Sequence, residues 1–182
     1  MRAGELRHRA AVLELDADLC PVELGRAWLG IHSKESADAP MQAGLRSRTP
    51  VEIRARYSPL LQVGRYLIHD ARLLHITSVR DPVGTRAELR ITADEFTGAA
   101  ADYHPAEGLH KCCRVHLAHE APWLDERGVV TDYKTRAEVA LIEVGRPQVG
   151  DRLTVGGTTY TIVGYADETD DGVVRGLWLE RY

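Results

Sequence analysis

The clearest pattern in the chain is an alternation of apolar and polar residues. Between Val51 and Tyr57, apolar side chains occupy every second position and charged side chains stand between them. This period of two is typical of a strand with one buried face. The segment Arg152–Ile162 predicts a hairpin, because Gly156 and Gly157 at its centre tolerate the positive φ angles of a primed turn.

Helical periodicity is scarce along the chain. At most a short helix, broken at Pro40, is expected over Ser36–Arg46. Short strands separated by turns therefore dominate. They predict an all-β fold, with two small antiparallel β-barrels or sandwiches in tandem, long loops and little helix.

The chain carries an internal repeat. A shift of 86 residues lays Val51–Val79 on Ala137–Tyr165 without a gap, and six positions are identical, among them a Gln-Val-Gly turn in each copy. A last apolar strand matches at a shift of 88, which predicts two extra residues in the acidic loop Asp167–Asp171. Two related barrels explain this repeat, and chance similarity between two β-rich segments is the alternative.

The repeat predicts two domains that fold separately. The first spans residues 1–96 and the second spans residues 112–182. Residues 97–111 show neither helical nor strand periodicity and predict a linker. The charge differs between the halves, since residues 1–99 carry a net charge of +1 and residues 100–182 carry −5.

Composition excludes several classes of protein. The 182 residues are 44% hydrophobic and 27% charged, which is enough to bury a core. A net charge of −4 argues against nucleic-acid binding by bulk positive charge. No apolar stretch approaches the length of a membrane span, and three cysteines, two of them adjacent, imply no disulfide framework. We therefore expect a soluble protein made in a reducing compartment.

Motifs for enzymatic chemistry are absent from the sequence. It contains neither a nucleophile elbow nor a glycine-rich phosphate-binding loop. The acidic loop lacks the alternating oxygen ligands and the turn glycine of a calcium site. We predict no catalytic residues, no cofactor and no enzymatic activity.

A cluster of histidines and cysteines is the strongest candidate for a metal site. Its spacing disfavours zinc, because the adjacent Cys112 and Cys113 would face opposite sides of a strand. A strand with Cys113, Val115 and Leu117 on one face is expected instead, and no metal is predicted. The members of the cluster are His104, His110, Cys112, Cys113, His116 and His119.

Arginines predict a basic outward face on the first half. Because arginine pairs bidentately with carboxylates, this face suits an acidic partner, although a merely solvated strand face is the alternative. The residues concerned are Arg54, Arg56, Arg65, Arg72, Arg86 and Arg90.

The chain opens with Gly4-Glu5-Leu6-Arg7-His8-Arg9 and continues into an apolar strand, and in this opening the first half resembles the head–tail joining (head-closure) proteins of tailed bacteriophages. These typically begin with G-x-L-[RD]-[HR]-R before an apolar strand, as Gly4–Arg9 does here. The resemblance continues through residues 27–31, 51–57, 65–68, 74–81 and 86–95. It departs at Ser33–Ala43, where family members usually carry a longer helical segment.

The second half is similar to the small head–tail joining protein of lambda-like phages. Its recognisable parts are Gly150–Gly156, Tyr160–Tyr165 and Gly176–Leu179, with an acidic loop between the last two. Both families are related small β-barrels, which would account for the repeat. The resemblance implies a structural virion protein. Such a protein forms a connector (neck) ring that closes the DNA-filled head and docks the tail.

The resemblance implies partners and a location. We expect a homo-oligomeric ring of six copies, with twelve as the alternative, in the neck of a virion assembled in the host cytoplasm. Its partners would be the portal or adaptor protein and the tail terminator or tail tube protein. DNA would pass without specific binding, and no membrane would be involved. The alternatives are a tail-terminator or tail-completion ring, and a β-barrel that binds zinc or a small ligand through His110, Cys112, Cys113 and His116.

Two groups of residues are predicted to carry this role. The first would contact the portal, the adaptor or neighbouring subunits, and consists of Gly4, Leu6, Arg7, His8, Arg9, Arg54 and Arg56. The second is an acidic loop expected to face the channel and repel DNA phosphates, and consists of Asp167, Glu168, Asp170 and Asp171.

Overall fold

A computed structural model describes residues 6–32, 44–47, 49–124 and 128–182. The chain divides into two compact units, Met1–Phe96 and Thr97–Tyr182. Among the described residues nearly all regular structure is β-strand, with one four-residue α-helix and one short 3-10 turn. This confirms the predicted all-β fold with little helix. The helix expected over Ser36–Arg46 falls largely outside the described residues, as does the departure from the phage family at residues 33–43.

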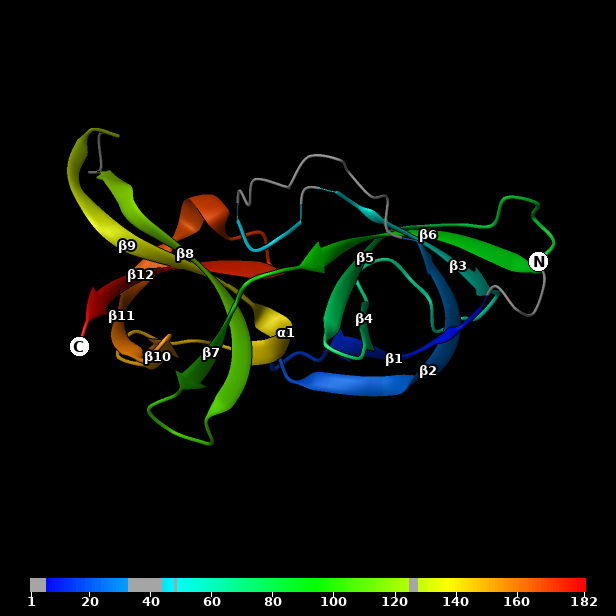
Figure 1. The fold of residues 1–182 in the computed structure, drawn as a ribbon, viewed down its shortest axis with the longest axis horizontal. Coiled ribbons are helices and arrows are strands. Elements are labelled where there is room, and N and C mark those ends of the chain that lie inside the picture. The colour runs from blue at the N-terminus through cyan, green and yellow to red at the C-terminus, as the bar shows by residue number, and fades with distance from the viewer. Residues whose placement is uncertain (1–5, 33–43, 48, 125–127) are drawn as a thin grey trace. The chain divides into compact units, whose positions relative to one another are not determined.

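The first unit is a closed, six-stranded antiparallel barrel (Figure 1). Its strands follow one another around the barrel in the order β1-β2-β3-β6-β5-β4, and β4 pairs back onto β1. Alternate apolar side chains fill the interior, among them Leu29, Ile53, Leu67 and Ile76. The strands are β1 (His8–Leu15), β2 (Pro21–His32), β3 (Val51–Arg56), β4 (Tyr66–His69), β5 (Arg72–Arg80) and β6 (Glu88–Phe96).

The second unit is a second closed barrel with the same topology. Its order is β10-β11-β12-β9-β8-β7, with β7 closing onto β10, so each strand has the neighbours of its counterpart in the first barrel. The elements are β7 (Ala99–His104), β8 (Lys111–Leu124), β9 (Val130–Ala140), the helix α1 (Leu141–Val144), β10 (Arg152–Val155), β11 (Thr158–Ala166), the 3-10 turn η2 (Asp167–Thr169) and β12 (Val174–Arg181). The β8–β9 hairpin is the longest in this barrel (Figure 1).

The linker predicted over residues 97–111 is wrong for its first part. Strand β7 lies there and pairs with both β8 and β10, so it is needed to close the second barrel. Its side chains do alternate, with Ala101 and Tyr103 buried and Asp102 exposed. Alanine gives little contrast in hydrophobicity, and the run of three alanines therefore concealed the alternation.

Backbone hydrogen bonds show how closely the two copies match. The N–H of Gly64 donates to the carbonyl of Ile76 at 2.9 Å, and the N–H of Gly150 donates to the carbonyl of Ile162 at 2.8 Å. Each copy also has a β-bulge one residue further on, between Ile76 and Ser78 in β5 and between Ile162 and Gly164 in β11. A turn, a hairpin and a bulge thus recur with the shift of 86 residues.

The structure corrects the shift of 88 for the last strand. Ile76 lies opposite Ala93, and Ile162 lies opposite Leu179, so the shift of 86 continues to the end of β12. The connections 81–87 and 167–173 are therefore equal in length, and the acidic loop has no extra residues. Sequence comparison gave a shift that was two residues too long, because a displacement of two residues leaves every side chain on its own face of the strand.

A buried carboxylate ties the second barrel together. Asp151 is 2% exposed and accepts hydrogen bonds from the hydroxyl of Tyr103, the N–H of Ala106 at 2.7 Å and the N–H of Gln148 at 2.7 Å. Burial and this contact raise the pKa of Tyr103 well above its ordinary value. These bonds join β7 to the Gln-Val-Gly turn.

The first barrel has an arginine at the equivalent position. Arg65 donates from Nε to Glu14 of β1 at 3.1 Å, and from Nη1 to the carbonyls of Pro59 and Leu60. The two barrels therefore join the first strand to the same turn with side chains of opposite charge.

No helix among the described residues is long and apolar enough to cross a membrane.

Candidate functional site

Strand β3 presents arginines on the outside of the first barrel. Val51, Ile53 and Ala55 point into the core, so Arg54 and Arg56 point outward, as the alternation predicted. Arg54 lies directly opposite Arg90 of β6, and Arg90 lies directly opposite Arg80 of β5. We call this row of Arg54, Arg90 and Arg80 the arginine ladder.

The arginine ladder lines a pocket of about 330 Å³, which we call the arginine pocket. Arg80 and Arg90 are exposed, and neither forms a salt bridge within the described residues. Like charges directly opposite one another on adjacent strands destabilise a sheet, so this row favours a bound anion. Besides the ladder, the lining consists of His32, Glu52, Ile53, Ser78, Ile91 and Thr92.

A second pocket, of about 430 Å³, adjoins Arg56. We call it the aromatic pocket because Trp28, 56% exposed, and Tyr57, 41% exposed, form its apolar part. The guanidinium of Arg86 lies 5.7 Å from the centre of the Tyr57 ring. Exposed tryptophan and tyrosine beside arginine are typical of residues that anchor protein–protein contacts. The lining also includes Leu6, Arg26, Ala27 and Ser58.

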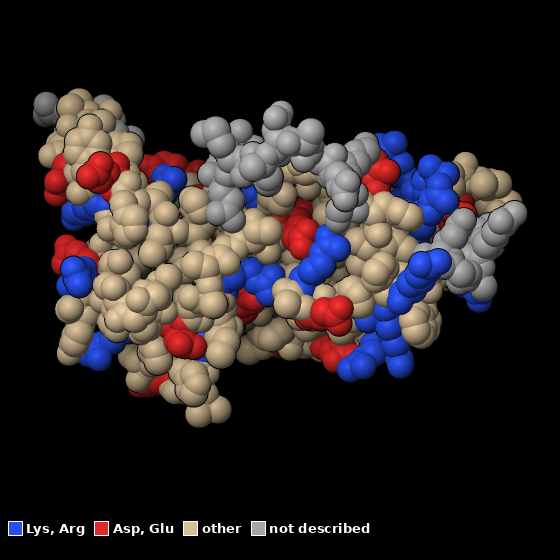
Figure 2. Space-filling model, in the orientation of Figure 1, with Lys and Arg blue, Asp and Glu red and all other residues tan. Residues whose placement is uncertain are grey.

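Several predicted contact residues meet at these pockets. Leu6 and Arg56, far apart in the sequence, line the aromatic pocket, and Arg54 belongs to the arginine ladder. Figure 2 shows Lys and Arg side chains gathered over part of the surface that the first barrel forms. Arg7 and Arg9, which follow Leu6 closely in the sequence, are exposed. Gly4 lies outside the described residues.

His8, another predicted contact residue, contacts a second histidine. Its Nδ1 lies 3.0 Å from Nε2 of His69 on β4, and the Nδ1 of His69 lies 3.3 Å from the carbonyl of Arg9. Burial, and then the charge of His69, lower the pKa of His8 from its ordinary value. His8 therefore resists taking up a proton in the folded barrel.

Two arginines of the predicted basic face have other roles. Arg65 pairs with Glu14, and Arg72 forms two hydrogen bonds of 2.7 Å with Glu95. Conversely, sequence reasoning missed Arg80 and Trp28. Trp28 could have been found, because it stands between the inward-facing Ala27 and Leu29 and must therefore point outward.

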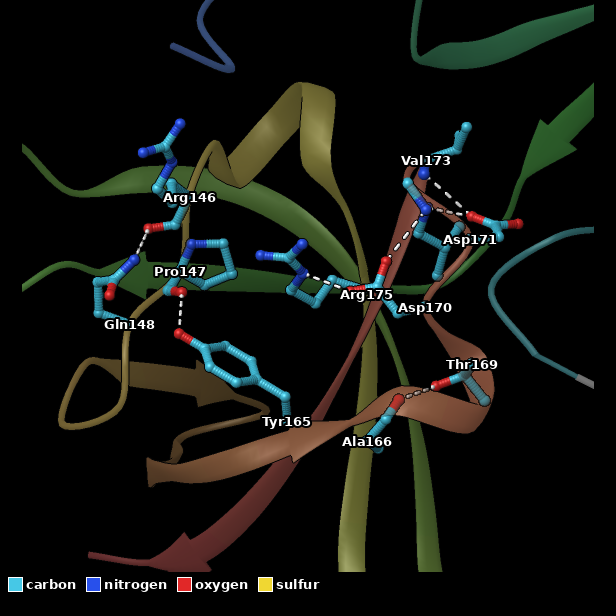
Figure 3. Close-up of polar contacts among 12 residues, drawn as sticks. Arg146, Pro147, Gln148, Tyr165, Ala166, Thr169, Asp170, Asp171, Val173 and Arg175 are labelled. Atoms are coloured by element: carbon cyan, nitrogen blue, oxygen red, sulfur yellow. Dashed lines mark hydrogen bonds and ion pairs between the residues drawn. The ribbon is translucent and has the colours of Figure 1, made fainter. Parts of the chain in front are cut away.

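The acidic loop is held by contacts within its own barrel (Figure 3). Asp170 Oδ2 accepts from Arg175 Nε at 2.8 Å, and Thr169 donates to the carbonyl of Ala166. Asp171 accepts from the N–H groups of residues 173 and 174, while Glu168 lies 3.6 Å from Arg136. Its carboxylates are therefore not an open row, and their channel-facing position stays a prediction.

The His/Cys cluster lies on β7, β8 and the connections around them. Cys113 points into the barrel and Cys112 outward, as predicted for adjacent strand residues. Burial, followed by the charge of Glu143, raises the pKa of Cys113 to about 12, so its thiol keeps its proton. The rings of His104 and His110 lie 6.1 Å apart. Within the described ranges no three His, Cys, Asp or Glu side chains converge to hold a metal ion.

Comparison of the chain with family models, curated proteins and solved structures found no match.

Proposed function

We propose that this chain is a structural, non-catalytic component of a head–tail connector ring in a tailed-phage particle, where it closes the DNA-filled head and docks the tail. The proposal starts from the resemblance of the N-terminal motif and the strands to head–tail joining proteins. The convergence of predicted contact residues on the outside of one closed barrel is the observation that carries it. Leu6, Arg56 and Trp28 form one pocket there, and Arg54 belongs to the adjoining ladder.

The fold suits a component of a ring. A closed ring needs two different, complementary surfaces on each subunit. The two barrels share a topology but differ in charge, so each chain offers a more basic and a more acidic unit. Six chains would present twelve barrels, which fits the junction between a twelve-fold portal and a six-fold tail that the resemblance implies.

Mass measurement of the purified particles, together with their symmetry in electron-microscope images, tests this function. We expect closed rings of six chains. Rings of twelve chains would contradict the copy number and keep the function. A chain that stays monomeric, alone and with portal or tail-tube rings, would contradict the function itself.

A paired variant tests the predicted contact residues. Arg54→Glu with Arg56→Glu should prevent assembly while each barrel still unfolds cooperatively, because outward-facing charges contribute little to stability. Arg146→Glu with Arg181→Glu, on exposed positions of the second barrel, imposes the same change of charge and should assemble normally. Normal assembly of the first variant would count against these contacts.

A further inference from the structure

The lining of the arginine pocket carries three arginines and one carboxylate, that of Glu52, so the pocket has a net positive charge. Asp81 follows Arg80 directly, but its carboxylate accepts the N–H groups of Val83, Gly84 and Arg86 at 3.2, 2.9 and 2.8 Å. These bonds, with that from Arg86 the largest cause, lower the pKa of Asp81. The nearest acid of the loop is thus bound to its own turn, and the pocket remains open.

The equivalent position in the second barrel is closed. Ala166 lies opposite Gly176 there, just as Arg80 lies opposite Arg90 in the first barrel. Both Ala166 and Gly176 are buried, because the turn η2 folds back over them. A side chain at Gly176 would collide with Thr169 Oγ1 and with the carbonyl oxygen of Ala166.

The acidic turn of the second barrel contacts an arginine at this end of the strands. Asp170 of the connection reaches Arg175 of β12 at 2.8 Å (Figure 3). The two connections have equal lengths, so their sequences decide which strand end is covered. Arg175 corresponds to the inward-facing Leu89 of the first barrel, so this ion pair holds the turn from the other face of β12. The first barrel presents Arg80 and Arg90 at the strand end that η2 covers in the second barrel.

A second copy of the chain supplies a suitable acidic turn. Asp167 is exposed, and the side chain of Glu168 remains 51% exposed beside Arg136. Guanidinium groups pair with carboxylates in a planar, bidentate geometry. The net charge of −4 disfavours DNA phosphate as the anion, whereas charges of +1 and −5 on the two halves favour contact between unlike barrels.

We infer that the arginine pocket of one copy receives the turn η2 of the next copy, with Asp167 and Glu168 facing Arg80 and Arg90. The inference rests on the proposed ring, because a head-to-tail contact between unlike surfaces is what closes a ring. It assigns the acidic loop to a contact between subunits in place of the channel wall.

Charge exchange tests this contact in the full chain. One variant carries Arg80→Glu and Arg90→Glu, and the other carries Asp167→Arg and Glu168→Arg. Each variant alone should self-associate at least about tenfold more weakly than the unmodified chain, because like charges then face each other. An equal mixture should assemble again, since each pocket then meets a loop of opposite charge, and the two variants should alternate around the particle.

Matched variants and unfolding curves control for folding and for net charge. Arg146→Glu with Arg181→Glu, and Glu107→Lys with Glu180→Lys, change the charge by the same amounts on exposed positions outside both surfaces. Both should self-associate normally. All variants should keep a cooperative unfolding transition at low concentration, which separates a loss of self-association from a loss of folding.

The outcomes separate this contact from the ring. Rings that form regardless of either exchange would overturn the contact and keep the proposed function. If the mixture restores self-association only as open chains or dimers, the contact is supported and the proposed ring is overturned. Failure of the mixture to assemble would show that the pocket does not meet η2. If the chain with Arg80→Glu and Arg90→Glu lost binding to a DNA duplex but kept its self-association, the contact would also be overturned. An unmodified chain that never self-associates would also overturn the contact.

Discussion

At the scale of single residues, the arginine ladder places three positive charges in direct register on adjacent strands. A sheet gains when unlike charges face each other and loses when like charges do. Arg90 is the middle member and faces Arg54 on one side and Arg80 on the other. Repulsion between these arginines therefore destabilises the isolated barrel at the position where the proposed acidic turn would bring negative charge.

Replacing the middle arginine should stabilise the monomeric chain. We expect Arg90→Thr to raise the free energy of unfolding by about 0.2–1 kcal/mol, because the substitution removes two like-charge contacts and keeps a residue suited to strands. Urea unfolding at low ionic strength measures the effect, and about 1 M salt should reduce it by screening. Arg56→Thr is the matched control, since Arg56 faces Glu88 and its loss should bring no gain. A less stable Arg90→Thr chain would contradict the argument.

Gly176 marks the opposite solution in the second barrel. A Cβ at this position would lie 2.5 Å from the carbonyl oxygen of Ala166 and would collide with Thr169. Gly176→Ala should therefore lower the free energy of unfolding by about 1–3 kcal/mol, the usual cost of overpacking. Gly164→Ala is the control on the neighbouring strand, because its Cβ would meet no atom nearer than 3.8 Å. Equal effects of the two substitutions in thermal unfolding would show that η2 yields without cost.

At the scale of elements, the pair of His8 and His69 joins the start of β1 to the end of β4. Because the folded barrel lowers the pKa of His8, the unfolded chain binds a proton more readily than the folded chain does. The stability that neutral His8 contributes is fully present above about pH 6.5, the ordinary pKa of histidine, and is lost as the pH falls through the lower pKa of His8 in the folded state.

A pH series should show this loss. We expect the free energy of unfolding of the first unit to decrease between pH 7.5 and pH 5, and His8→Gln to make the decrease shallower. The measurement is urea unfolding of residues 1–96 at several pH values. A slope that His8→Gln leaves unchanged would assign the pH dependence to other groups.

The strands that sequence patterns predicted are those with strong contrast between their faces. Strand β3 and the Gly-Gly hairpin were found because large apolar residues or two glycines leave few alternatives. Strand β7 was missed because alanine contributes almost no contrast, although Tyr103 is buried in it. Only its pairing on both sides, a property of the closed barrel, identifies it.

The candidate site was predicted in part for a related reason. Alternation within one strand shows that Arg54 and Arg56 point outward, but nothing in a single strand shows which residues lie opposite. The ladder depends on the register of three strands, and Arg80 was therefore missed. The same limit made Arg65 and Arg72 resemble surface residues, because their partners Glu14 and Glu95 are distant in sequence.

At the scale of the whole molecule, each unit closes its own barrel and has its own core. We therefore expect residues 1–96 and residues 97–182 each to unfold cooperatively as separate fragments. A shorter fragment, 112–182, should fail to do so. It lacks β7, which leaves β8 and β10 with open edges and deprives the buried Asp151 of Tyr103.

Circular dichroism and urea titration of the three fragments check this prediction. The two longer fragments should give sigmoidal transitions, and residues 112–182 should give a gradual one or aggregate. A cooperative transition in residues 112–182 would mean that β7 is dispensable and that the linker interpretation of residues 97–111 was adequate.

A chain with two barrels of one topology faces a hazard during folding, because a strand from one copy can pair within the other. Arg65 and Asp151 occupy the same position in the two copies, and each is matched only to its own barrel. Exchange of these segments would set a carboxylate beside Glu14 and bury an arginine beside Tyr103, and both arrangements are strongly unfavourable. The opposite charges of Arg65 and Asp151 thus favour pairing of each half of the chain with its own strands over exchange between the halves.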